Sequence, residues 1–251
     1  MELITSRKNA TIRRLRLLGS DAQARRREGE TLCDGMKTLE EALRFGARVG
    51  TVLWKKQAAE LSLPAEIEQY ILPEELFDYV SPMKNSPGPL FTVAIRGCAK
   101  PGMLRNAIVL EDVQDPGNVG TVIRSANAFG IGAVILVGAC ADPYAPKTVR
   151  STMGAIFRQP VLSMERQYLG DFLRDQSLPL YGAALSPRAE DVRRVELKNA
   201  AVAVGSEGHG LSRELLSLCE KEIIIPMNPD SESLNAAVAA SVLMWEASRS
   251  F

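Results

Sequence analysis

The chain has 251 residues, of which 46% are hydrophobic and 24% are charged, with 30 basic and 30 acidic side chains; this is typical of a globular protein with one large domain or two modest ones. No apolar run reaches the roughly 18 to 20 residues of a membrane helix, and the charged N-terminus is unlike a signal peptide, so we expect a cytoplasmic protein with no membrane partner. The cysteines Cys33, Cys98, Cys140 and Cys219 form no C-x-x-C pair, and the chain has one histidine, so we expect reduced thiols and no metal site.

The first predicted element is a basic helix. Apolar residues at Ile12, Leu15 and Leu18 have helical spacing. Residues 1–27 hold eight basic side chains against two acidic ones, and the rest of the chain carries the compensating negative charge. This pattern is typical either of an arm that binds a phosphate backbone or of a solvated helix face, and charge alone favours neither.

Strands and helices alternate after this helix. We expect strands at 31–33, 49–54, 70–72 and 91–95, with helices at 36–45 and 74–80. The stretch before the last strand, SPMKNSPGPL, is rich in turn residues and is expected to be a loop. Residues 1–97 therefore predict a small α/β domain, followed by a linker at about residues 97–105, GCAKPGMLR.

The second block, residues 106–251, is longer and more regular. The expected strands are 107–113, 133–137, 179–184, 201–204 and 222–225, and the expected helices are 119–129, about 147–154, 168–174, 212–219 and one from about 234. Near-continuous apolar strands such as AVILV, alternating with helices, predict a mainly parallel sheet covered on both faces. Because ligands bind beyond the carboxyl ends of such strands, the loops after strands are the candidate site.

The first such loop runs into the helix expected at 119–129. Asn118 stands where a helix N-cap belongs, after the Pro116-Gly117 turn. Arg124 lies in the second turn of a helix whose neighbours are mostly small or apolar. It is either a surface charge or a clamp for an anion, a role that suits its forked guanidinium.

The second loop, VGSEGHGLS at 204–212, is rich in glycine and allows backbone to approach a ligand closely. A dinucleotide-binding turn needs the order G-x-G-x-x-G and an acidic residue after the next strand. This loop has the order G-x-x-G-x-G, so an oxidoreductase is disfavoured. His209 has no partner nearby in sequence and is expected to face solvent.

The third loop precedes the C-terminal helix. Ser231 or Ser233 is expected to cap that helix. Asn235 then has no capping task and becomes a candidate for orienting a substrate.

Together the three loops, NVGTVIRSANAFG, VGSEGHGLS and IPM with SLNAAVAAS, resemble the three motifs of the SpoU (TrmH-type) RNA ribose methyltransferases of the SPOUT superfamily. The N-terminal segments ITSRKNATIRRLRLL and ARRREGETLCDGMKTLEEAL are similar, more loosely, to the ribosomal-protein-like substrate-binding domain that often precedes this catalytic domain. The resemblance implies a C-terminal α/β domain with a trefoil knot, a rare exception to unknotted folding. It also implies a homodimer that packs through the knot region.

The resemblance further implies residue roles. S-adenosylmethionine would bind in a pocket lined by Gly205, Glu207, Ile225, Met227 and Leu234. The RNA and the transferring methyl group would be addressed by Asn118, Arg124, Ser233 and Asn235. Structured RNA, either rRNA or tRNA, would be positioned through its phosphates by Arg7, Lys8, Arg13, Arg14, Arg25, Arg26 and Arg27.

The implied reaction is attack of a ribose 2′-hydroxyl on the sulfonium methyl group, so the protein has to align the reactants and remove one proton. Arg124 either accepts this proton or only clamps a phosphate. The second role is considered because guanidinium in proteins is almost always protonated. The alternative function is a non-catalytic RNA-binding protein or ribosome assembly factor built on the same scaffold.

Overall fold

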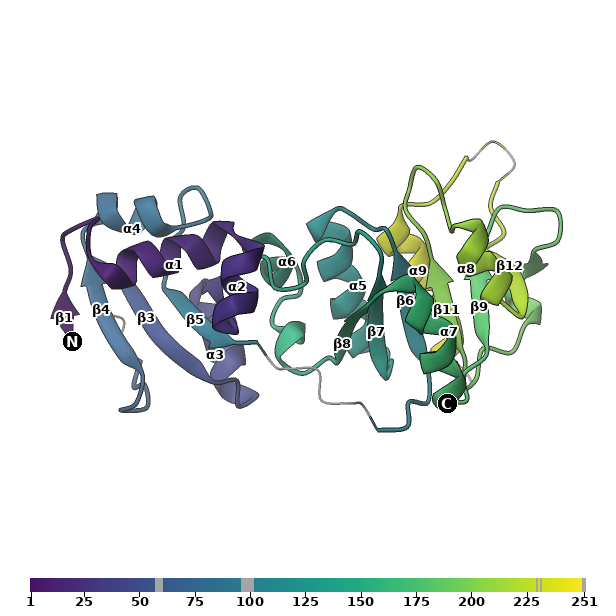
Figure 1. The fold of residues 1–251 in the computed structure, drawn as a ribbon, viewed down its shortest axis with the longest axis horizontal. Helices are drawn as coiled ribbons and strands as arrows, with labels where there is room; N and C mark the ends of the chain where they lie inside the picture. Colours follow the sequence, from purple (N-terminus) through teal and green to yellow (C-terminus); the bar gives the residue numbers. More distant parts are fainter. Residues whose placement is uncertain (57–60, 96–101, 229, 231, 250–251) are drawn as a thin grey trace. The chain divides into compact units, whose positions relative to one another are not determined.

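The computed structural model describes all residues except 57–60, 96–101, 229, 231 and 250–251. Its chain forms two compact units, residues 1–97 with 144–157 and residues 98–143 with 158–251 (Figure 1). Most of the predicted linker, residues 97–101, lies outside the described residues.

The first unit contains a mixed five-stranded sheet in the order β1, β4, β3, β5, β2. Its strands are β1 (Glu2–Leu3), β2 (Glu30–Asp34), β3 (Val49–Lys55), β4 (Glu68–Leu72) and β5 (Leu90–Ala94). Strands β1 and β4, and β3 and β4, pair in parallel, whereas β5 runs antiparallel to both β2 and β3. The two-residue strand β1 is too short to leave a periodic signal and was not predicted.

Helices α1 (Ala10–Ser20), α2 (Ala22–Glu28), α3 (Met36–Arg44) and α4 (Glu74–Val80) accompany this sheet. The predicted spacing of α1 is confirmed, because Ile12, Leu15 and Leu18 are fully buried in one cluster with residues of α4. The helix begins where the Oδ1 atom of Asn9 accepts hydrogen bonds from two backbone N–H groups of its first turn.

Residues 144–157 belong to the first unit, although their sequence suggested a place in the second block. They form α6 (Pro146–Ser151) and a 3-10 turn (Ala155–Phe157), shorter than the helix expected at about 147–154. Val149, Ile156 and Phe157 are buried, and Thr31 Oγ1 donates a hydrogen bond of 2.6 Å to the carbonyl of Tyr144. Helix α6 therefore packs against β2, a pairing that no local pattern encodes.

The second unit contains a seven-stranded sheet in the order β10, β12, β9, β11, β6, β7, β8, and every strand pair in it is parallel. Its strands are β6 (Ala107–Glu111), β7 (Ala133–Val137), β8 (Val161–Met164), β9 (Leu180–Ala183), β10 (Glu190–Asp191), β11 (Ala201–Val204) and β12 (Lys221–Ile224). The predicted α/β class with a parallel sheet is confirmed. The edge strands β8 and β10, half exposed and short, were missed.

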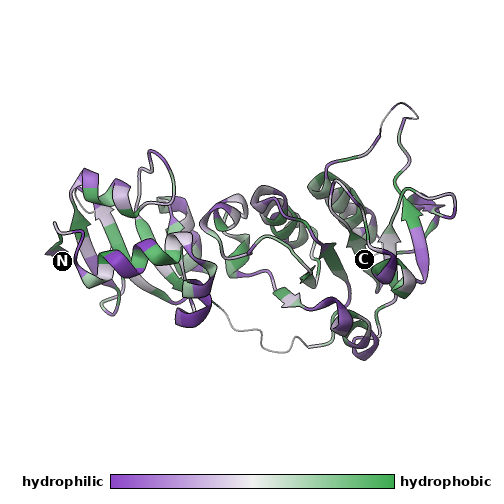
Figure 2. Cartoon of the chain, turned by 45° about the horizontal axis from the view of Figure 1, so that its top comes forward, coloured by the Kyte–Doolittle hydropathy of each residue, from purple (hydrophilic) through white to green (hydrophobic). Residues whose placement is uncertain are grey.

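Helices cover both faces of this sheet. Helices α7 (Arg166–Asp175) and α8 (Arg213–Leu218) pack on the face that carries Val109 and Ile135. Helices α5 (Pro116–Ala128) and α9 (Ala236–Ser248) contact each other on the opposite face, where alternate strand residues such as Ile108 and Leu110 are also fully buried. The inner strands therefore read as continuous apolar runs (Figure 2). No helix in the described part of the chain is long and apolar enough to cross a membrane.

Candidate active site

Three loops follow strands of the second unit at the carboxyl edge of its sheet. The first loop, residues 112–115, joins β6 to α5, the second loop, residues 205–212, joins β11 to α8, and the third loop, residues 225–235, joins β12 to α9. Strands β6 and β11 are direct neighbours, and β12 is separated from β11 by β9. Because all these strands are parallel, the loops emerge on one side of the sheet.

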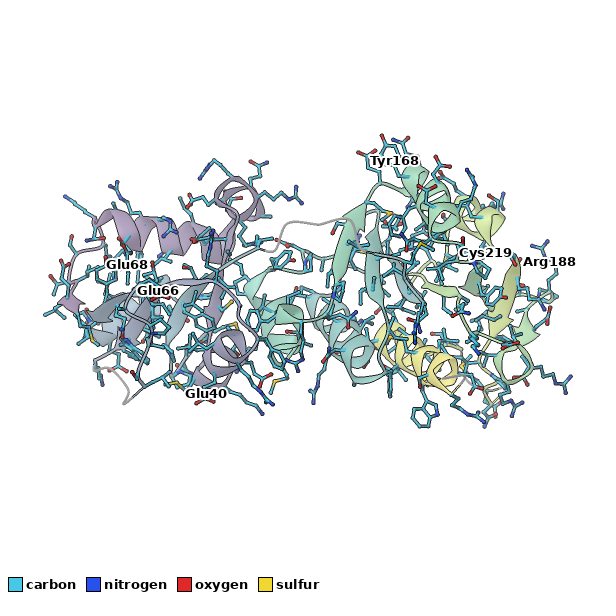
Figure 3. All side chains as sticks on the ribbon, turned by 90° about the horizontal axis from the view of Figure 1, so that it is seen from below. Glu40, Glu66, Glu68, Tyr168, Arg188 and Cys219 are labelled. Carbon is cyan, nitrogen blue, oxygen red and sulfur yellow. The ribbon has the colours of Figure 1, made fainter. Side chains whose placement is uncertain are left out.

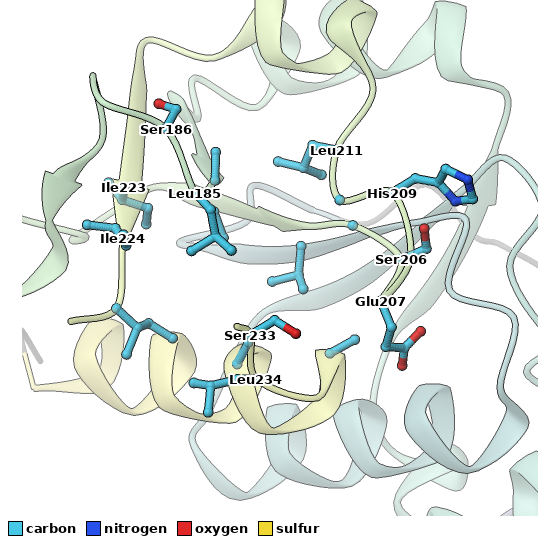
Figure 4. A pocket seen from close by; sticks show the side chains of 18 of the residues that line it. Leu185, Ser186, Ser206, Glu207, His209, Leu211, Ile223, Ile224, Ser233 and Leu234 are labelled. Carbon is cyan, nitrogen blue, oxygen red and sulfur yellow. The ribbon is translucent and has the colours of Figure 1, made fainter. Parts of the chain in front are cut away.

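A cavity of about 450 Å³ lies between the second and third loops (Figure 4). Its wall contains all five residues expected to bind the cofactor, together with Ser233; these five are Gly205, Glu207, Ile225, Met227 and Leu234. A volume of this size is typical of small-molecule pockets. The fold thus brings the residues of two separate sequence motifs around one cavity.

Gly205 is required by the shape of the second loop. A Cβ atom added to it would lie 2.1 Å from the carbonyl carbon of Gly210, closer than any real contact. Gly210 has a φ of +66°, and Ser206 and Gly210 form a bridge across the loop. A Cβ atom added to Gly208, in contrast, would meet nothing within 4 Å. At least part of the glycine pattern therefore serves the loop's own closure.

A chain of hydrogen bonds joins the beginning of α5 to the second and third loops. Asn118 Nδ2 donates to Glu207 Oε1, and Asn235 Nδ2 donates to Asn118 Oδ1 over 3.2 Å. These contacts place Asn118, Glu207 and Asn235, which are 28 to 117 positions apart in sequence, in one polar cluster. Asn118 and Asn235 lie beside the cavity wall at Glu207 and are not part of the wall itself.

Two capping assignments made from sequence are wrong. The N-cap of α5 is Asp115, whose Oδ1 accepts a 2.9 Å hydrogen bond from the Asn118 N–H, so Asn118 is inside the helix with its side chain free for Glu207. Asn235 caps α9, because its Oδ1 accepts from the N–H groups of Ala237 and Val238. Ser233 precedes this cap by two residues, and Ser231 lies outside the described residues. The Asn235 amide caps α9 through its oxygen and donates to Asn118 through its nitrogen, because an amide has an acceptor end and a donor end.

Arg124 is exposed on α5 and, within the described ranges, has no ion-pair or hydrogen-bond partner. It does not line the cavity. It lies three residues after Thr121, which shares an apolar hollow with Val238 and Trp245 of α9. Its guanidinium is therefore available to an incoming anion.

Some wall residues were not anticipated. Leu185 and Ser186, just after β9, line the cavity, as does Glu222 of β12. Ser186 Oγ donates to Glu222, and Arg188 Nη2 lies 2.7 Å from Glu222 Oε1. The only available signal was a serine directly after a predicted strand. His209 is exposed, as expected from sequence, but it also belongs to the residues that line the cavity, at the edge formed by the second loop (Figure 4).

A buried carboxylate links the beginning of the first loop to the end of the second. Glu111 at the end of β6 is only 1% exposed in its side chain, and it accepts hydrogen bonds from Arg166 Nε (2.6 Å) and from both N–H and Oγ of Ser212 (2.7 Å each). Arg166 also pairs with Asp112 at 2.9 Å. The hydrogen bond to Glu111 raises the pKa of the Arg166 guanidinium above its usual value. This network, which sequence patterns did not indicate, fixes both loops to the sheet.

In the first unit, the basic residues expected to contact RNA divide into two groups. Arg25 is only 5% exposed and donates 2.8 Å to the carbonyl of Leu18, so it serves the fold rather than a ligand. Arg14 pairs with Glu28 and Glu30, and Arg27 lies 3.4 Å from Glu28. The other four expected residues, all exposed and without an ion-pair partner among the residues described, are Arg7, Lys8, Arg13 and Arg26.

Comparisons with known proteins agree with this geometry. The model of the SpoU rRNA Methylase family matches residues 105–245. The chain is 32% identical over 98% of both chains to the 23S rRNA (guanosine(2553)-2′-O)-methyltransferase RlmP of Bacillus subtilis. It is 29% identical to the 23S rRNA (uridine(2479)-2′-O)-methyltransferase of Streptomyces viridochromogenes, over 98% of this chain and 91% of that one. The structure of the SpoU methyltransferase AviRb from S. viridochromogenes with AdoMet has a TM-score of 0.85, 27% identity, and coverage of 96% of this chain and 98% of that one.

Proposed function

The chain belongs to the SpoU rRNA methylase family, and we propose that it transfers a methyl group from S-adenosylmethionine to a ribose 2′-hydroxyl of ribosomal or transfer RNA. The observation that carries this proposal is the cavity between the second and third loops, with the cluster of Asn118, Glu207 and Asn235 beside it. Relatives that match almost the whole chain are named as 23S rRNA 2′-O-methyltransferases. Ribosomal RNA is therefore the substrate to test first.

The cavity fits S-adenosylmethionine in size and in chemistry. Ile225, Leu234 and Leu211 offer apolar wall for an adenine ring, and Glu207 offers a carboxylate to a cationic ligand. When bound, the cofactor supplies an electrophilic methyl group. The solved relative AviRb holds AdoMet, which supports the same cofactor here.

The residues of this chain have to align the ribose and remove its proton. Asn118 holds the Glu207 carboxylate at the cavity and is itself held by Asn235. We assign Ser233, which also lines the cavity, to the side where the ribose enters. Arg124 either clamps the phosphate next to the 2′-hydroxyl or accepts the proton of that hydroxyl. Its exposed guanidinium, without a carboxylate partner among the described side chains, suits the clamp, whereas the base role requires that bound RNA bury the guanidinium and make it neutral.

We assign the first unit to RNA binding. Its exposed cations Lys8, Arg13 and Arg26 can contact phosphates, which position an RNA without reading its sequence. The mixed sheet with helices agrees with the predicted ribosomal-protein-like domain. An RNA substrate and the free thiols of Cys33, Cys140 and Cys219 favour a cytoplasmic location.

We also propose that the chain after β11 is threaded as a trefoil knot. Three features support this: β11 inserts between β9 and β6, β12 lies beyond β9, and α9 then returns to contact both α5 and β11. A crystal structure of the complex with S-adenosylmethionine tests the threading and the cavity together. If the chain path in that crystal structure contains no knot, the proposed threading is wrong.

The protein is proposed to act as a homodimer through α9 and α5. Val238, Val242 and Trp245 of α9 are 49%, 38% and 56% exposed, and with Thr121 they line an apolar hollow. Such an apolar surface favours burial against a second copy. Because Arg124 lies beside this hollow on α5, the interface and the reacting groups are near each other.

Tritiated methyl transfer from S-adenosylmethionine to total rRNA and tRNA tests the function. We expect transfer to one RNA fraction, and a loss of at least about a hundredfold in Arg124→Ala with cofactor binding unchanged, because Arg124 is outside the cavity wall. Arg174→Gln is the control, since the one ion-pair partner of Arg174 among the described residues is the exposed Asp171. A near wild-type rate in Arg124→Ala excludes both roles of Arg124. No transfer by a protein that still binds RNA favours the non-catalytic alternative.

A further inference from the structure

Two arginines of the first unit lie against one aromatic ring. The guanidinium carbons of Arg7 and Arg16 are 4.5 Å and 3.8 Å from the ring centroid of Tyr79 on α4. Arg16 Nη1 also donates a 3.0 Å hydrogen bond to the carbonyl of Tyr79. Arg16 and Tyr79 were not among the residues expected to contact RNA.

This pair of cations has no counter-ion on the described part of the chain. Two other cations of the same unit, in contrast, are neutralised: Arg14 pairs with two glutamates, and Lys55 pairs with Glu74 and Asp78. Two guanidinium groups at one ring, without an acidic partner, make the local potential positive, and this favours binding of an anion.

The surroundings of the pair extend the positive charge. Lys8 is exposed beside Arg7, and Arg13 is exposed one helical turn before Arg16 on α1. Figure 3 shows α1 and α3 on opposite sides of the sheet, with Glu40 on the side of α3. Arg13 and Arg16, as residues of α1, are therefore on the other side of the sheet from Glu40.

We propose that Arg7 and Arg16, held by the ring of Tyr79, form a clamp for backbone phosphates of the substrate RNA. The inference rests on the proposed function, because it names how the first unit holds that substrate. A guanidinium whose face lies on an aromatic ring keeps its N–H edge free for phosphate oxygens. The ring also restricts both long side chains before binding, which lowers the entropy cost of the contact.

The test measures binding of the full chain to a fluorescent RNA hairpin by anisotropy over a series of salt concentrations. The double variant Arg7→Gln, Arg16→Gln should bind roughly tenfold more weakly near physiological salt, and the slope of log K against log salt should fall by about 0.7 to 0.9 for each lost contact. Point substitutions are used because deletion of residues 1–27 would remove Ile12, Leu15 and Leu18 from the core.

Variants of Tyr79 separate a clamp from bulk charge. Tyr79→Phe keeps the ring and should bind like the wild type, whereas Tyr79→Leu keeps every charge and should lose several-fold in affinity. Arg44→Gln is the matched control, because Arg44 lies 5.3 Å from the ring of Phe45 but is paired with Glu41. It should bind RNA like the wild type. Thermal unfolding of each variant verifies that it is folded.

Wild-type affinity and slope in the double variant overturn the clamp, and so does unchanged binding by a folded Tyr79→Leu. The clamp is also wrong if the double variant loses binding to polyglutamate but binds RNA like the wild type. The surface would then serve an acidic protein partner. The assay needs no methyl transfer. A wild type that transfers no methyl group while the clamp variants lose RNA binding refutes the proposed function and leaves the clamp standing.

Discussion

At the scale of single residues, the second loop depends on glycine at one position and tolerates a side chain at another. Gly205→Ala places its Cβ 2.1 Å from Gly210 backbone atoms and 2.5 Å from the Leu211 nitrogen, and none of these can rotate away. We expect a destabilisation of about 1 to 3 kcal/mol and weaker binding of S-adenosylmethionine, since the loop forms part of the cavity wall.

Thermal unfolding and isothermal titration with S-adenosylmethionine measure these two effects. Gly208→Ala is the matched control, because its Cβ meets nothing within 4 Å, and it should stay within about 0.5 kcal/mol of the wild type. Equal behaviour of the two variants would show that the contact between Gly205 and Gly210 is not what shapes the loop.

The partly buried thiol of Cys219 has a reactivity that depends on its surroundings. Burial raises its pKa to about 12, and nearby Glu222 acts in the same direction. The thiolate is the reactive form, so Cys219 should react with iodoacetamide far more slowly than a model thiol at pH 8 in the folded protein, and at a normal rate in denaturant. Mass spectrometry of the modified peptides measures both rates; equal rates in the two states would contradict this environment.

At the scale of elements, Glu111 and Arg166 fasten two loops to the sheet. Glu111→Gln and Arg166→Gln should each lower stability, by up to about 3 to 5 kcal/mol where a buried charge is left without its partner. Arg166→Gln should cost more, because it leaves the Glu111 carboxylate at 1% exposure, whereas Glu111→Gln leaves Arg166 at 29% exposure with Asp112 still beside it.

Denaturant unfolding of the two single variants and the double variant gives the coupling energy of the pair. Arg174→Gln on the same helix α7 is the control, since its ion pair with Asp171 is exposed on both sides and should contribute at most about 1 kcal/mol. Additive single effects would mean that the contact between Glu111 and Arg166 contributes no stability of its own.

At the scale of the whole molecule, the apolar hollow of α9 predicts self-association. Trp245→Glu should shift the protein from dimer to monomer in sedimentation equilibrium, because it places a charge in the proposed interface next to Phe129, whose ring lies 5.8 Å away. Leu218→Glu, at an exposed position of α8, should leave the dimer intact. A wild-type protein that is monomeric at micromolar concentration would contradict the dimer.

Sequence by itself determined the elements and the family. The strand Ala133–Val137 and the helix Glu74–Val80 have the predicted bounds. A strand buried on both faces is a continuous apolar run, and a helix buried on one side has apolar residues at helical spacing, so both can be recognised in the sequence. Three motif loops after predicted strands indicated the candidate site, because in a parallel sheet the carboxyl ends of the strands meet at one edge.

Only the tertiary structure decided what each polar side chain does. Asp115 caps α5, and the side chain of Asn118 instead bonds to Glu207 and Asn235, which lie 89 and 117 positions away. The same holds for Arg25, which local charge placed on the surface and packing placed in the interior. The spacing of apolar residues indicates which side of an element is buried. Hydrogen-bond partners depend on contacts between segments that are distant in sequence, and no local sequence pattern indicates such contacts.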